Sequence, residues 1–542
     1  HMGCFIGRLC AGNFQLSIVK NNKNQGGCKN MSYQETYKKW CTDPYFDAQT
    51  QEELKNLEGN EKEIEDCFYR QLEFAREATL CLNANGIHTY LFESLRPTPE
   101  LSFAVRELGC IAGIVITASH NPREYNGYKV YWEDGAQITP PHDKNILAEV
   151  AKVTDFSMVK TMEEDEARAE NLFSIIGTDF DDKYIAQLKK QSIHPEAAKD
   201  MKIVYTPLHG TGNIPVRRVL RELGFTQVYV VEEQKVPDGN FPTVPYPNPE
   251  DKNAWTLALE LAKKVDADII LATDPDADRL GVHAKDTKTG EYVSFTGNMS
   301  GMLIAEYILR ERTKTGTMPE NPALVETIVT TDMAKAVAKE YNTALIEVLT
   351  GFKYIGEQIR LFDETGSHHY VFGLEESYGC LAGTYARDKD APVAVMMLCE
   401  VAAYYKLQGK TLWDAMVELY EKYGYYKEDL ATVTLKGIDG SQKITAMMNA
   451  FRENPPKELG GFKVLACRDY KSDCRRDMIT GETTSTGLPT SNVLYYELEN
   501  NAWCCVRPSG TEPKIKYYFG VKGENFKDAE EKLEAIKKAM TE

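Results

Sequence analysis

Three apolar runs of strand length each end directly in a polar loop, and this pattern constrains the fold more than any other. The runs and their loops read IAGIVITASHNP (from residue 111), ADIILATDPDADRLG (from 267) and HHYVFGLEESYG (368–379). Each lies in a block where strand-like runs alternate with helical patterns, which predicts doubly wound α/β sheets. A fourth block, from about residue 428, mixes β-prone runs with a closing amphipathic helix and reads as α+β.

The length of 542 residues corresponds to about three to four domains at roughly 150 residues per domain. The composition shifts place the predicted domains at 31–195, 196–314, 322–424 and 428–542. Residues 1–30 contain Arg8 and three lysines but no acidic residue, and Met31 opens more ordinary sequence. We expect 1–30 to be a disordered leader of vector-derived or untranslated origin.

Composition excludes several classes of protein. With 42% hydrophobic residues the chain can form packed cores, so wholesale disorder is excluded. A net charge of -18 argues against a general nucleic-acid or anionic-membrane surface, and no apolar run reaches the ~18 residues that span a bilayer. The 13 cysteines are scattered without a CxxC pair, which favours a reducing, cytoplasmic location over a disulfide framework.

The loop TDPDADRLG (273–281) carries the strongest chemical signal. Asp274, Asp276 and Asp278 alternate, so in extended backbone all three carboxylates point to one side. Convergent carboxylate oxygens indicate a divalent cation, most simply Mg²⁺. An EF-hand is excluded because Arg279 and Lys285 stand where that loop needs Gly and Glu. A solvated acidic turn is the remaining alternative.

The loop ITASHNPREYNGYK (116–129) places Ser119 and His120 where a strand ends. A hydroxyl there, beside an imidazole, suits a nucleophile or phosphate carrier, and Lys129 supplies a cation. The alternative is that Ser119 only caps a turn, because Ser and Asn are common turn residues.

Two further loops offer groups for a phosphorylated ligand. In GLEESYG, Glu375 and Ser377 offer an acceptor and a hydroxyl suited to sugar OH groups, although an acidic surface turn explains them equally well. The nearby segment ARDKD (386–390) adds charged residues, and charged runs of this kind usually form only a solvated surface. In the loop RPSGTEPK, Arg507 offers a guanidinium, Ser509 and Thr511 offer hydroxyls, and the backbone of Gly510 can approach a ligand closely. Together these groups could bind a phosphate dianion.

In this order the four loops TASHNP, DPDADR, EESYG and RPSGTEPK resemble those of the α-D-phosphohexomutase family of phosphoglucomutase and phosphomannomutase. The resemblance runs from about Ala75 to the C-terminus, and TPLHGTG and TGFKYIG place it nearest the phosphoglucomutase/phosphopentomutase-type branch. It implies a heart-shaped molecule of four domains around a central cleft, three of them doubly wound α/β and the last α+β.

The resemblance also implies residue roles. Ser119 would carry the phosphoryl group and, with the three aspartates, bind Mg²⁺. His120 and Arg279 would neighbour the transferred phosphate, and Lys129 would assist proton transfer. The implied substrate-binding residues are Lys353, Glu375, Ser377, Arg387, Lys389, Arg507, Ser509, Gly510 and Thr511.

The first domain departs from the family pattern. The segment FYRQLEF (68–74) runs directly into AREATLCLNANG (75–86), where the family has a glycine-rich loop of the form GT(A/G)GLRG and further strands. We infer a deletion of several dozen residues, which would leave an unpaired sheet edge and exposed apolar surface and remove one active-site arginine.

The resemblance predicts an intramolecular phosphotransferase that interconverts glucose 1-phosphate and glucose 6-phosphate, with Mg²⁺ as cofactor and glucose 1,6-bisphosphate as activator. Phosphopentomutase or phosphomannomutase activity, or a catalytically impaired paralogue, are the alternatives. We expect a phosphosugar as the only class of partner, with no nucleic acid or membrane, and a monomer or weak homo-oligomer.

Overall fold

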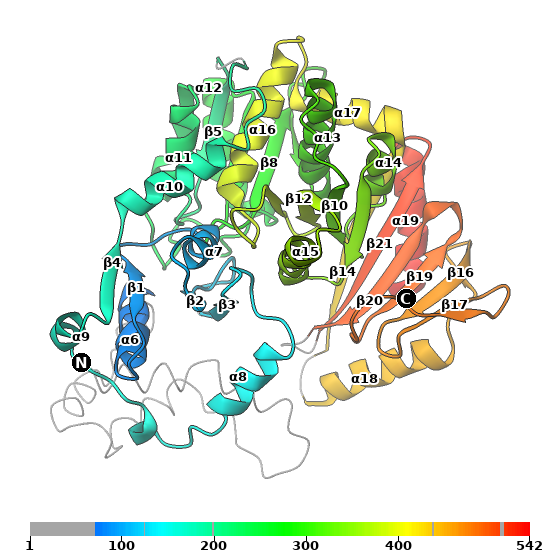
Figure 1. The fold of residues 1–542 in the computed structure, drawn as a ribbon. Coiled ribbons are helices and arrows are strands. Elements are labelled where there is room, and N and C mark those ends of the chain that lie inside the picture. Colours follow the sequence, from blue (N-terminus) through cyan, green and yellow to red (C-terminus); the bar gives the residue numbers. More distant parts are fainter. Residues whose placement is uncertain (1–70, 124, 198–199, 436–437, 510–513, 542) are drawn as a thin grey trace.

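The computed structural model describes residues 71–541 except 124, 198–199, 436–437 and 510–513. The predicted leader, 1–30, lies outside the described residues. Along the described chain the elements follow an arc, from blue at the lower left of Figure 1, through green at the top, to orange and red at the right. Four blocks of sheet and helix succeed one another along this arc, which agrees with the predicted multidomain α/β architecture.

In the first block the described strands form two separate pairs instead of one continuous sheet. Strand β1 (Thr89–Phe92) pairs in parallel with β4 (Phe173–Ile176), and β2 (Ala112–Ile116) pairs antiparallel with β3 (Tyr128–Trp132). The helices of this block are α6 (Gln71–Asn83), α7 (Thr98–Glu107), α8 (His142–Val150), α9 (Glu164–Ala169) and α10 (Thr178–Lys189), with a 3₁₀ turn at Phe156–Met158.

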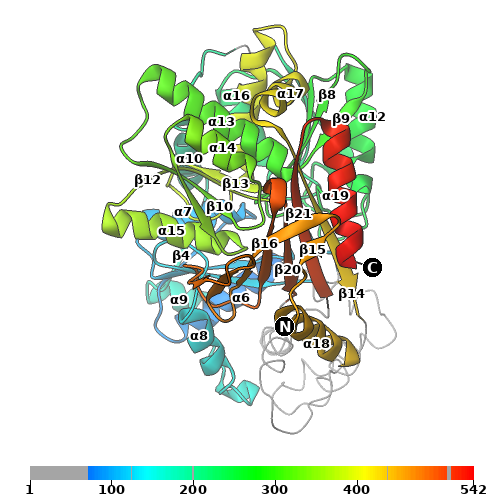
Figure 2. The same ribbon diagram turned by 90° about the vertical axis from the view of Figure 1, so that its right-hand side faces the viewer.

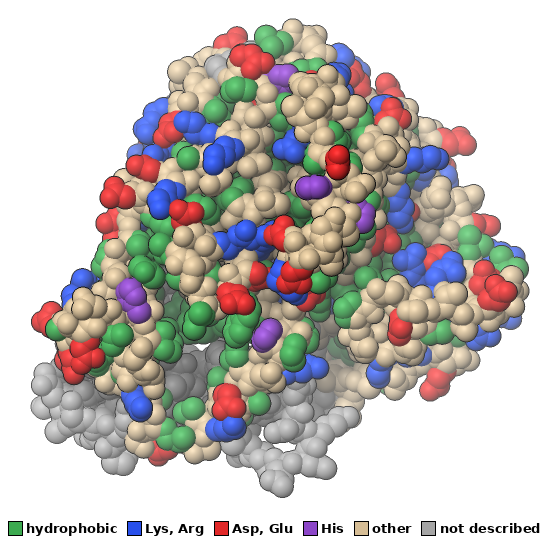
Figure 3. All heavy atoms as spheres, viewed as in Figure 1, with side chains coloured by type: hydrophobic (Ala, Val, Ile, Leu, Met, Phe, Trp, Pro, Cys, Tyr) green, Lys and Arg blue, Asp and Glu red, His purple; other side chains and the backbone are tan. Residues whose placement is uncertain are grey.

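Apolar side chains of this first block reach solvent. Ile87, Tyr90, Ile111, Tyr128 and Ile175 are all more than a third exposed. Figure 3 shows several green side chains on the corresponding lower-left part of the surface. Thin strand pairs with exposed apolar residues agree with the expectation that this block lacks strands, while the deletion itself stays a prediction.

The second block is a five-stranded sheet in the order β6-β5-β7-β8-β9, with β5 parallel to β6 and β7 and the other neighbours antiparallel. Its central strand β7 reads IILAT and is buried throughout, as expected for a strand covered on both faces. The elements are β5 (Lys202–Thr206), α11 (Asn213–Glu222), β6 (Gln227–Val230), α12 (Thr256–Val265), β7 (Ile269–Thr273), β8 (Leu280–Lys285), β9 (Tyr292–Phe295) and α13 (Gly297–Thr315), with 3₁₀ turns at Glu232–Gln234 and Lys252–Trp255.

The third block is a four-stranded sheet in the order β11-β10-β12-β13, parallel except for the final hairpin. Its helix α16 is almost uniformly apolar and buried, because it packs against α11 and α13 of the second block. The elements are β10 (Pro322–Thr327), α14 (Met333–Glu340), β11 (Ala344–Val348), α15 (Phe352–Thr365), β12 (His369–Glu375), β13 (Gly379–Ala382), α16 (Ala391–Lys406) and α17 (Leu412–Tyr423).

The fourth block is an antiparallel sheet in the order β14-β21-β20-β19-β16-β17-β18, with β15 added on β16. Figure 2 shows α19 running alongside this sheet, with α18 at its lower end. The elements are β14 (Tyr425–Thr434), α18 (Ile438–Glu453), β15 (Glu458–Leu459), β16 (Phe462–Asp469), β17 (Cys474–Asp477), β18 (Thr483–Thr484), β19 (Leu494–Leu498), β20 (Trp503–Pro508), β21 (Lys514–Gly523) and α19 (Phe526–Thr541), with a 3₁₀ turn at Glu499–Asn501.

The two largest hydrophobic cores in the described part of the chain organise these blocks. One runs without interruption from Phe103 of α7 through the second and third sheets to Tyr426 at the start of β14. The fourth sheet has a core of its own, closed by α19 through Leu533 and Ile536. The second and third blocks are therefore packed as one body, and their strand ends are held in fixed relation to each other.

Candidate active site

The loop between β7 and β8 reverses the chain within six residues and presents the three aspartates. The reversal uses Ala277 in a left-handed conformation (φ 52°). The TPLHGTG loop supports it from behind. Thr211 donates its backbone N–H to the carbonyl of Pro275 at 2.8 Å, and a Cβ on Gly210 would lie only 2.4 Å from Pro275 Cα. Only glycine permits this close approach.

The three predicted metal ligands converge. The carboxylates of Asp274, Asp276 and Asp278 are buried, and one ligand oxygen from each lies within 4.8 Å of the others. Asp274 Oδ1 accepts the backbone N–H groups of Asp278 and Arg279 at 3.0 Å each. The predicted convergence of the three carboxylates is therefore present, although a turn brings it about and not the extended backbone assumed from the alternation, and the backbone of the loop fixes Asp274.

Lysine side chains bind one carboxylate oxygen each of Asp276 and Asp278. Lys129 Nζ donates to Asp276 Oδ2 at 2.9 Å and to Asp278 Oδ2 at 3.1 Å, and Lys389 Nζ lies 2.9 Å from Asp278 Oδ2. The other oxygens, Asp276 Oδ1 and Asp278 Oδ1, are buried and have no hydrogen-bond partner among the described residues. Asp276 and Asp278 are therefore each anchored through one oxygen, while the other oxygen accepts no hydrogen bond from the described residues. Asp278 Oδ1 still has an ion-pair contact with Arg279 Nε at 3.9 Å.

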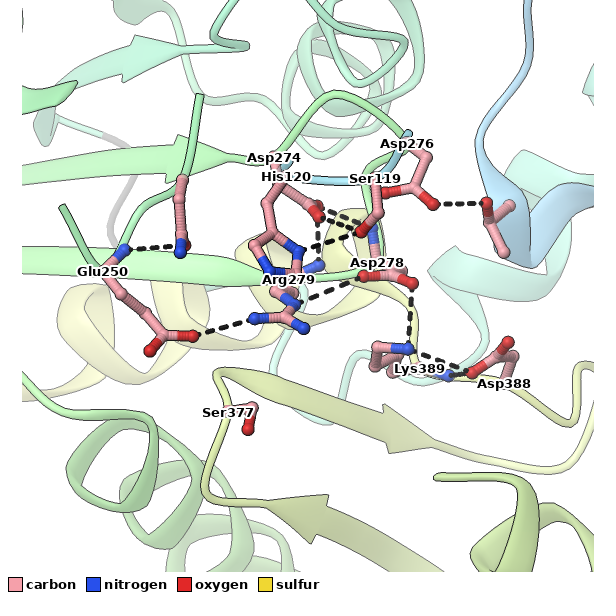
Figure 4. A network of polar contacts seen from close by, with 12 residues as sticks. Ser119, His120, Glu250, Asp274, Asp276, Asp278, Arg279, Ser377, Asp388 and Lys389 are labelled. Carbon is pink, nitrogen blue, oxygen red and sulfur yellow. Dashed lines mark hydrogen bonds and ion pairs between the residues drawn. The ribbon is translucent and has the colours of Figure 1, made fainter. Parts of the chain in front are cut away.

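Ser119 lies beside this cluster, as Figure 4 shows. It follows β2, has φ 51°, and its Oγ donates to Asp274 Oδ2 at 3.4 Å and lies 3.1 Å from His120 Nδ1. The β2–β3 hairpin pairs Val115 with Lys129, so it brings this lysine next to the serine loop. The sequence signals at residues 116–129 thus form one side of the site.

The surroundings of His120 and Arg279 shift their pKa values in opposite directions. Burial, together with the positive charge of Arg279, lowers the pKa of His120 to about 3, so the imidazole is neutral at pH 7. Burial also disfavours the charged form of Arg279, but the carboxylates of Asp278 and Glu250 outweigh it and raise the pKa. Arg279 donates from Nη1 to Glu250 Oε1 at 2.8 Å, which fixes the guanidinium beside the cluster.

The β12–β13 hairpin carries Glu375, at the end of β12, and Ser377, in its turn. Figure 4 shows Ser377 on the side of Arg279 away from Ser119. The backbone N–H of Leu280 donates to the carbonyl of Tyr378 at 2.9 Å, which ties this turn to the metal loop. Burial raises the pKa of Glu375 to about 7, against the opposing charge of Lys389. Ser377 Oγ donates to Glu376 Oε1 at 3.2 Å.

The two cationic side chains of the segment ARDKD (386–390) make contacts in different parts of the structure. Lys389 is buried and joins the aspartate cluster. Arg387 does not, because its guanidinium pairs with Asp363 of α15, 2.5 Å away, and faces Arg106 of α7. Arg387 therefore pairs away from the aspartate cluster, and its predicted role in substrate binding stays a prediction. Lys353 is also apart from the aspartates, with Nζ over the Tyr354 ring at 5.1 Å.

The phosphate-binding loop is described only at its ends. Arg507 belongs to β20 and Ser509 follows it, whereas Gly510 and Thr511 lie outside the described residues. Lys516 faces Arg507 across β20 and β21. Burial lowers the pKa of Lys516, and so do the nearby charges of Arg507 and Arg279.

Sequence reasoning missed three contributors to this site, namely Thr98, Glu250 and Lys516. Thr98 Oγ1 donates to Asp276 Oδ2 at 3.0 Å, and Glu250 anchors Arg279. Neither belongs to one of the four motifs. Lys516 had a signal, because in the strand KIKYYF it points to the same face as Lys514.

Comparison with known proteins agrees with this geometry. Models of the phosphoglucomutase/phosphomannomutase α/β/α domains I, II and III match residues 66–156, 182–288 and 296–423. Phosphoglucomutases of Staphylococcus aureus strains RF122 and USA300 are each 38% identical over 472 residues, which is 87% of this chain and 83% of theirs. The chain belongs to the phosphoglucomutase/phosphomannomutase family.

Solved structures show the same fold. A phosphoglucomutase/phosphomannomutase family protein from Burkholderia thailandensis superposes with a TM-score of 0.57 at 20% identity, covering 85% of this chain and 84% of its own. The exocytosis-sensitive phosphoprotein parafusin, a phosphoglucomutase from Paramecium, gives 0.60 at 17% identity, covering 88% and 84%.

Family membership confirms the predicted phosphohexomutase relationship and the multidomain α/β architecture. The chain is therefore an enzyme, an intramolecular phosphotransferase of the isomerase class. Among the described residues, no helix is both long and apolar enough to cross a membrane.

Proposed function

We propose that this phosphohexomutase is a Mg²⁺-dependent phosphoglucomutase in which Ser119 carries the phosphoryl group. The observation that carries the proposal is the placement of Ser119 Oγ, 3.4 Å from a carboxylate oxygen of the convergent aspartate cluster. A hydroxyl at that position has a buried acceptor beside it and a cation-binding set of oxygens within reach.

The donor set fits Mg²⁺. The ion prefers carboxylate oxygens, and here the Oδ1 atoms of Asp276 and Asp278 are buried without a hydrogen-bond partner among the described residues, in one cluster with the Asp274 carboxylate. Unpartnered buried oxygens are costly, and a cation relieves that cost. Asp274, Asp276, Asp278 and a phosphoryl oxygen on Ser119 would hold the ion, which would offset the charge of the transferring phosphoryl group.

Several residues of the chain itself would serve the transfer. Phospho-Ser119 would give its phosphoryl group to a hydroxyl of the sugar monophosphate. The P–O bond to Oγ breaks as the new P–O bond forms, and the attacking hydroxyl loses one proton while Oγ gains one, so that no net proton is released. Although burial disfavours the ammonium form of Lys129, Asp276 and Asp278 raise its pKa, so Lys129 is a cation that can protonate the departing Oγ. Arg279 would neutralise charge on the phosphoryl oxygens.

The same site then works in reverse after the sugar bisphosphate turns end for end. The substrate hydroxyls would contact Glu375, Ser377 and Lys389, and Lys353 would line the site from α15. The distal phosphate would be held by Arg507, Ser509, Gly510 and Thr511. Lys516 beside Arg507 supports a phosphate site there, because two neighbouring cations favour a dianion.

Glucose phosphates are the proposed substrates because the curated relatives at 38% identity are phosphoglucomutases. Glucose 1,6-bisphosphate would activate the enzyme by phosphorylating Ser119. Phosphopentomutase or phosphomannomutase activity is the second candidate. An impaired paralogue is the third, favoured by the two separate strand pairs of the first block.

We also propose the domain limits 31–195, 196–314, 322–424 and 428–542, and a cytoplasmic monomer or weak homo-oligomer. The sheets of the four blocks fall within these ranges, except that β14 begins at Tyr425, three residues before the proposed start of the fourth domain. The cysteines in the described part of the chain are free, which suits a reducing compartment.

A coupled assay tests the function. Glucose 6-phosphate formation from glucose 1-phosphate is followed with Mg²⁺ and a trace of glucose 1,6-bisphosphate, and ribose 1-phosphate and mannose 1-phosphate are assayed in parallel. The proposal predicts the highest kcat/KM for glucose 1-phosphate. A higher value for another sugar would select the second candidate, and thermal stabilisation by ligand without turnover would select the impaired paralogue.

A further inference from the structure

Thr98 makes two hydrogen bonds to the central aspartate of the metal loop. Its Oγ1 donates to Asp276 Oδ2 at 3.0 Å, and its backbone N–H donates to the Asp276 carbonyl at 2.9 Å. Thr98 begins α7 in the first block, whereas Asp276 belongs to the second block. Thr98 is 1% exposed and Asp276 4%, so water does not compete for the hydroxyl.

The position of Thr98 is fixed by its neighbours. It stands between Pro97 and Pro99, whose rings restrict the backbone on both sides. Arg96 donates from Nε and Nη2 to the two carboxylate oxygens of Asp181 at 2.7 and 2.9 Å, which attaches this segment to α10. The threonine hydroxyl is therefore presented by rigid backbone.

The two oxygens of Asp276 have different surroundings. Oδ2 accepts from both Thr98 and Lys129, while Oδ1 is buried without a hydrogen-bond partner among the described residues. Two donors on one oxygen fix the rotation of the carboxylate about its Cβ–Cγ bond. Oδ1 is thereby left free, on an aspartate whose ligand oxygen lies within 4.8 Å of those of Asp274 and Asp278.

We infer that Thr98 is a positioning residue for metal binding, which holds Asp276 so that Oδ1 is presented to Mg²⁺. The inference rests on the proposed Mg²⁺ site and adds to it a residue outside the four motif loops. Lys129 supplies charge to the same oxygen, but its long side chain is flexible and it also serves Asp278. Thr98 supplies a short, directional donor from the first residue of α7, and such a donor orients a metal ligand.

A purely structural role for Thr98 makes a different prediction. The backbone bond from Thr98 to the Asp276 carbonyl already ties the two blocks together, and it persists when the side chain is changed. Thr98→Val removes only the hydroxyl and keeps the shape of the side chain. If the threonine served only to tie the blocks, this variant would bind metal like the wild type.

The test is a calorimetric titration of the full-length protein with MgCl₂ alone, without substrate. We expect Thr98→Val to weaken Mg²⁺ binding by about 10- to 100-fold, the usual effect of losing a residue that orients a metal ligand. Thr98→Ser should restore binding to within a few-fold, because it keeps the donor. Thr98→Ala is a second variant without the donor, and it should reproduce the loss if valine disturbs packing.

Thr79→Val is the matched control, because Thr79 is a buried threonine whose hydroxyl bonds to the Ala75 carbonyl of its own helix at 2.8 Å. This control should bind Mg²⁺ like the wild type. Equal Mg²⁺ affinity of Thr98→Val and the wild type would overturn the positioning role of Thr98 but would leave the metal site itself standing. A wild type that binds no more Mg²⁺ than Asp276→Ala would overturn the metal site and the inference with it.

Discussion

Lys389 Nζ lies 2.9 Å from Asp278 Oδ2, and this contact joins the third block of the chain to the metal loop of the second. Lys129 of the first block reaches the same oxygen at 3.1 Å. Three blocks thus meet at one buried carboxylate. The relative positions of the three blocks therefore depend on the balance between the Asp278 carboxylate and the two lysines, and that balance depends on the positions of the blocks.

Replacing Lys389 with Met should therefore affect both stability and activity. Lys389 is 9% exposed and the side chain of Asp278 1%, so the variant leaves a buried carboxylate with less compensation. Removing one partner of a buried pair costs about 3–5 kcal/mol. We expect a clear fall in Tm in a thermal melt and a loss of most mutase activity.

Lys406→Met provides the comparison. Lys406 pairs with Asp268 at 2.9 Å, but both side chains are about one-third exposed. Exposed pairs contribute roughly 0–1 kcal/mol, so this variant should melt close to the wild type. Equal effects of the two substitutions would show that burial of the Lys389 pair has no special consequence.

Glu250→Gln should lower kcat with little change in stability. The substitution removes the charge that holds Arg279 Nη1 at 2.8 Å, and we expect about a tenfold loss because the guanidinium is less well fixed beside the transferred phosphate. Glu250 is 35% exposed, so its ion pair contributes little to folding. Unchanged kcat in a steady-state assay would remove Glu250 from the site.

Metal removal should abolish activity reversibly. We expect a chelator to reduce the rate by at least about 100-fold, and excess MgCl₂ to restore it, because the ion offsets the phosphoryl charge. Asp276→Ala should lose both the activity and its Mg²⁺ dependence, whereas Asp266→Ala, at a side chain 72% exposed, should keep both. Mg²⁺-stimulated turnover by Asp276→Ala would reject the metal assignment.

Asp390 predicts a pH-dependent stability. Burial raises its pKa from 3.8 to about 6, although hydrogen bonds from Tyr385, Val393 N–H and Tyr184 favour the ionised form. The folded state therefore holds the proton more tightly than the unfolded state, and this contribution to stability falls as pH rises from about 4 to 6. Each pKa unit corresponds to about 1.4 kcal/mol.

Asp390→Asn should remove that dependence, since asparagine stays neutral and still caps α16. The Tm of the variant minus that of the wild type should be more positive at pH 8 than at pH 4. A difference that stays constant across this range would show that Asp390 does not titrate as its burial implies.

The sequence predicted the parts of the site that are local. The alternation of Asp274, Asp276 and Asp278 predicted their convergence, but the structure achieves it through a tight turn with Ala277 in a left-handed conformation and not through extended backbone. Ser119 joins them because both loops follow strand ends. Thr98 and Glu250 could not be found this way, since each acts through a partner about 30 to 180 residues away in the chain.

Arg387 shows that closeness to a site residue in the sequence does not predict where a side chain points. It lies two residues before Lys389, and neighbouring residues on a loop point in directions that sequence does not fix. Its guanidinium pairs with Asp363, on a different side from the aspartates. The two separate strand pairs of the first block likewise depend on which segments are present to complete a sheet, and this was inferred only from the comparison of FYRQLEF with the family pattern.

The phosphorylation state of Ser119 during turnover tests the central claim most directly. Protein treated with glucose 1,6-bisphosphate is digested, and the peptide that contains Ser119 is examined by mass spectrometry before and after a chase with glucose 1-phosphate under conditions that prevent rephosphorylation. The account predicts one phosphoryl group on Ser119 that leaves during the chase, and no labelling or turnover in Ser119→Ala. A fully active Ser119→Ala variant, or phosphate that persists on Ser119 through the chase, would contradict it.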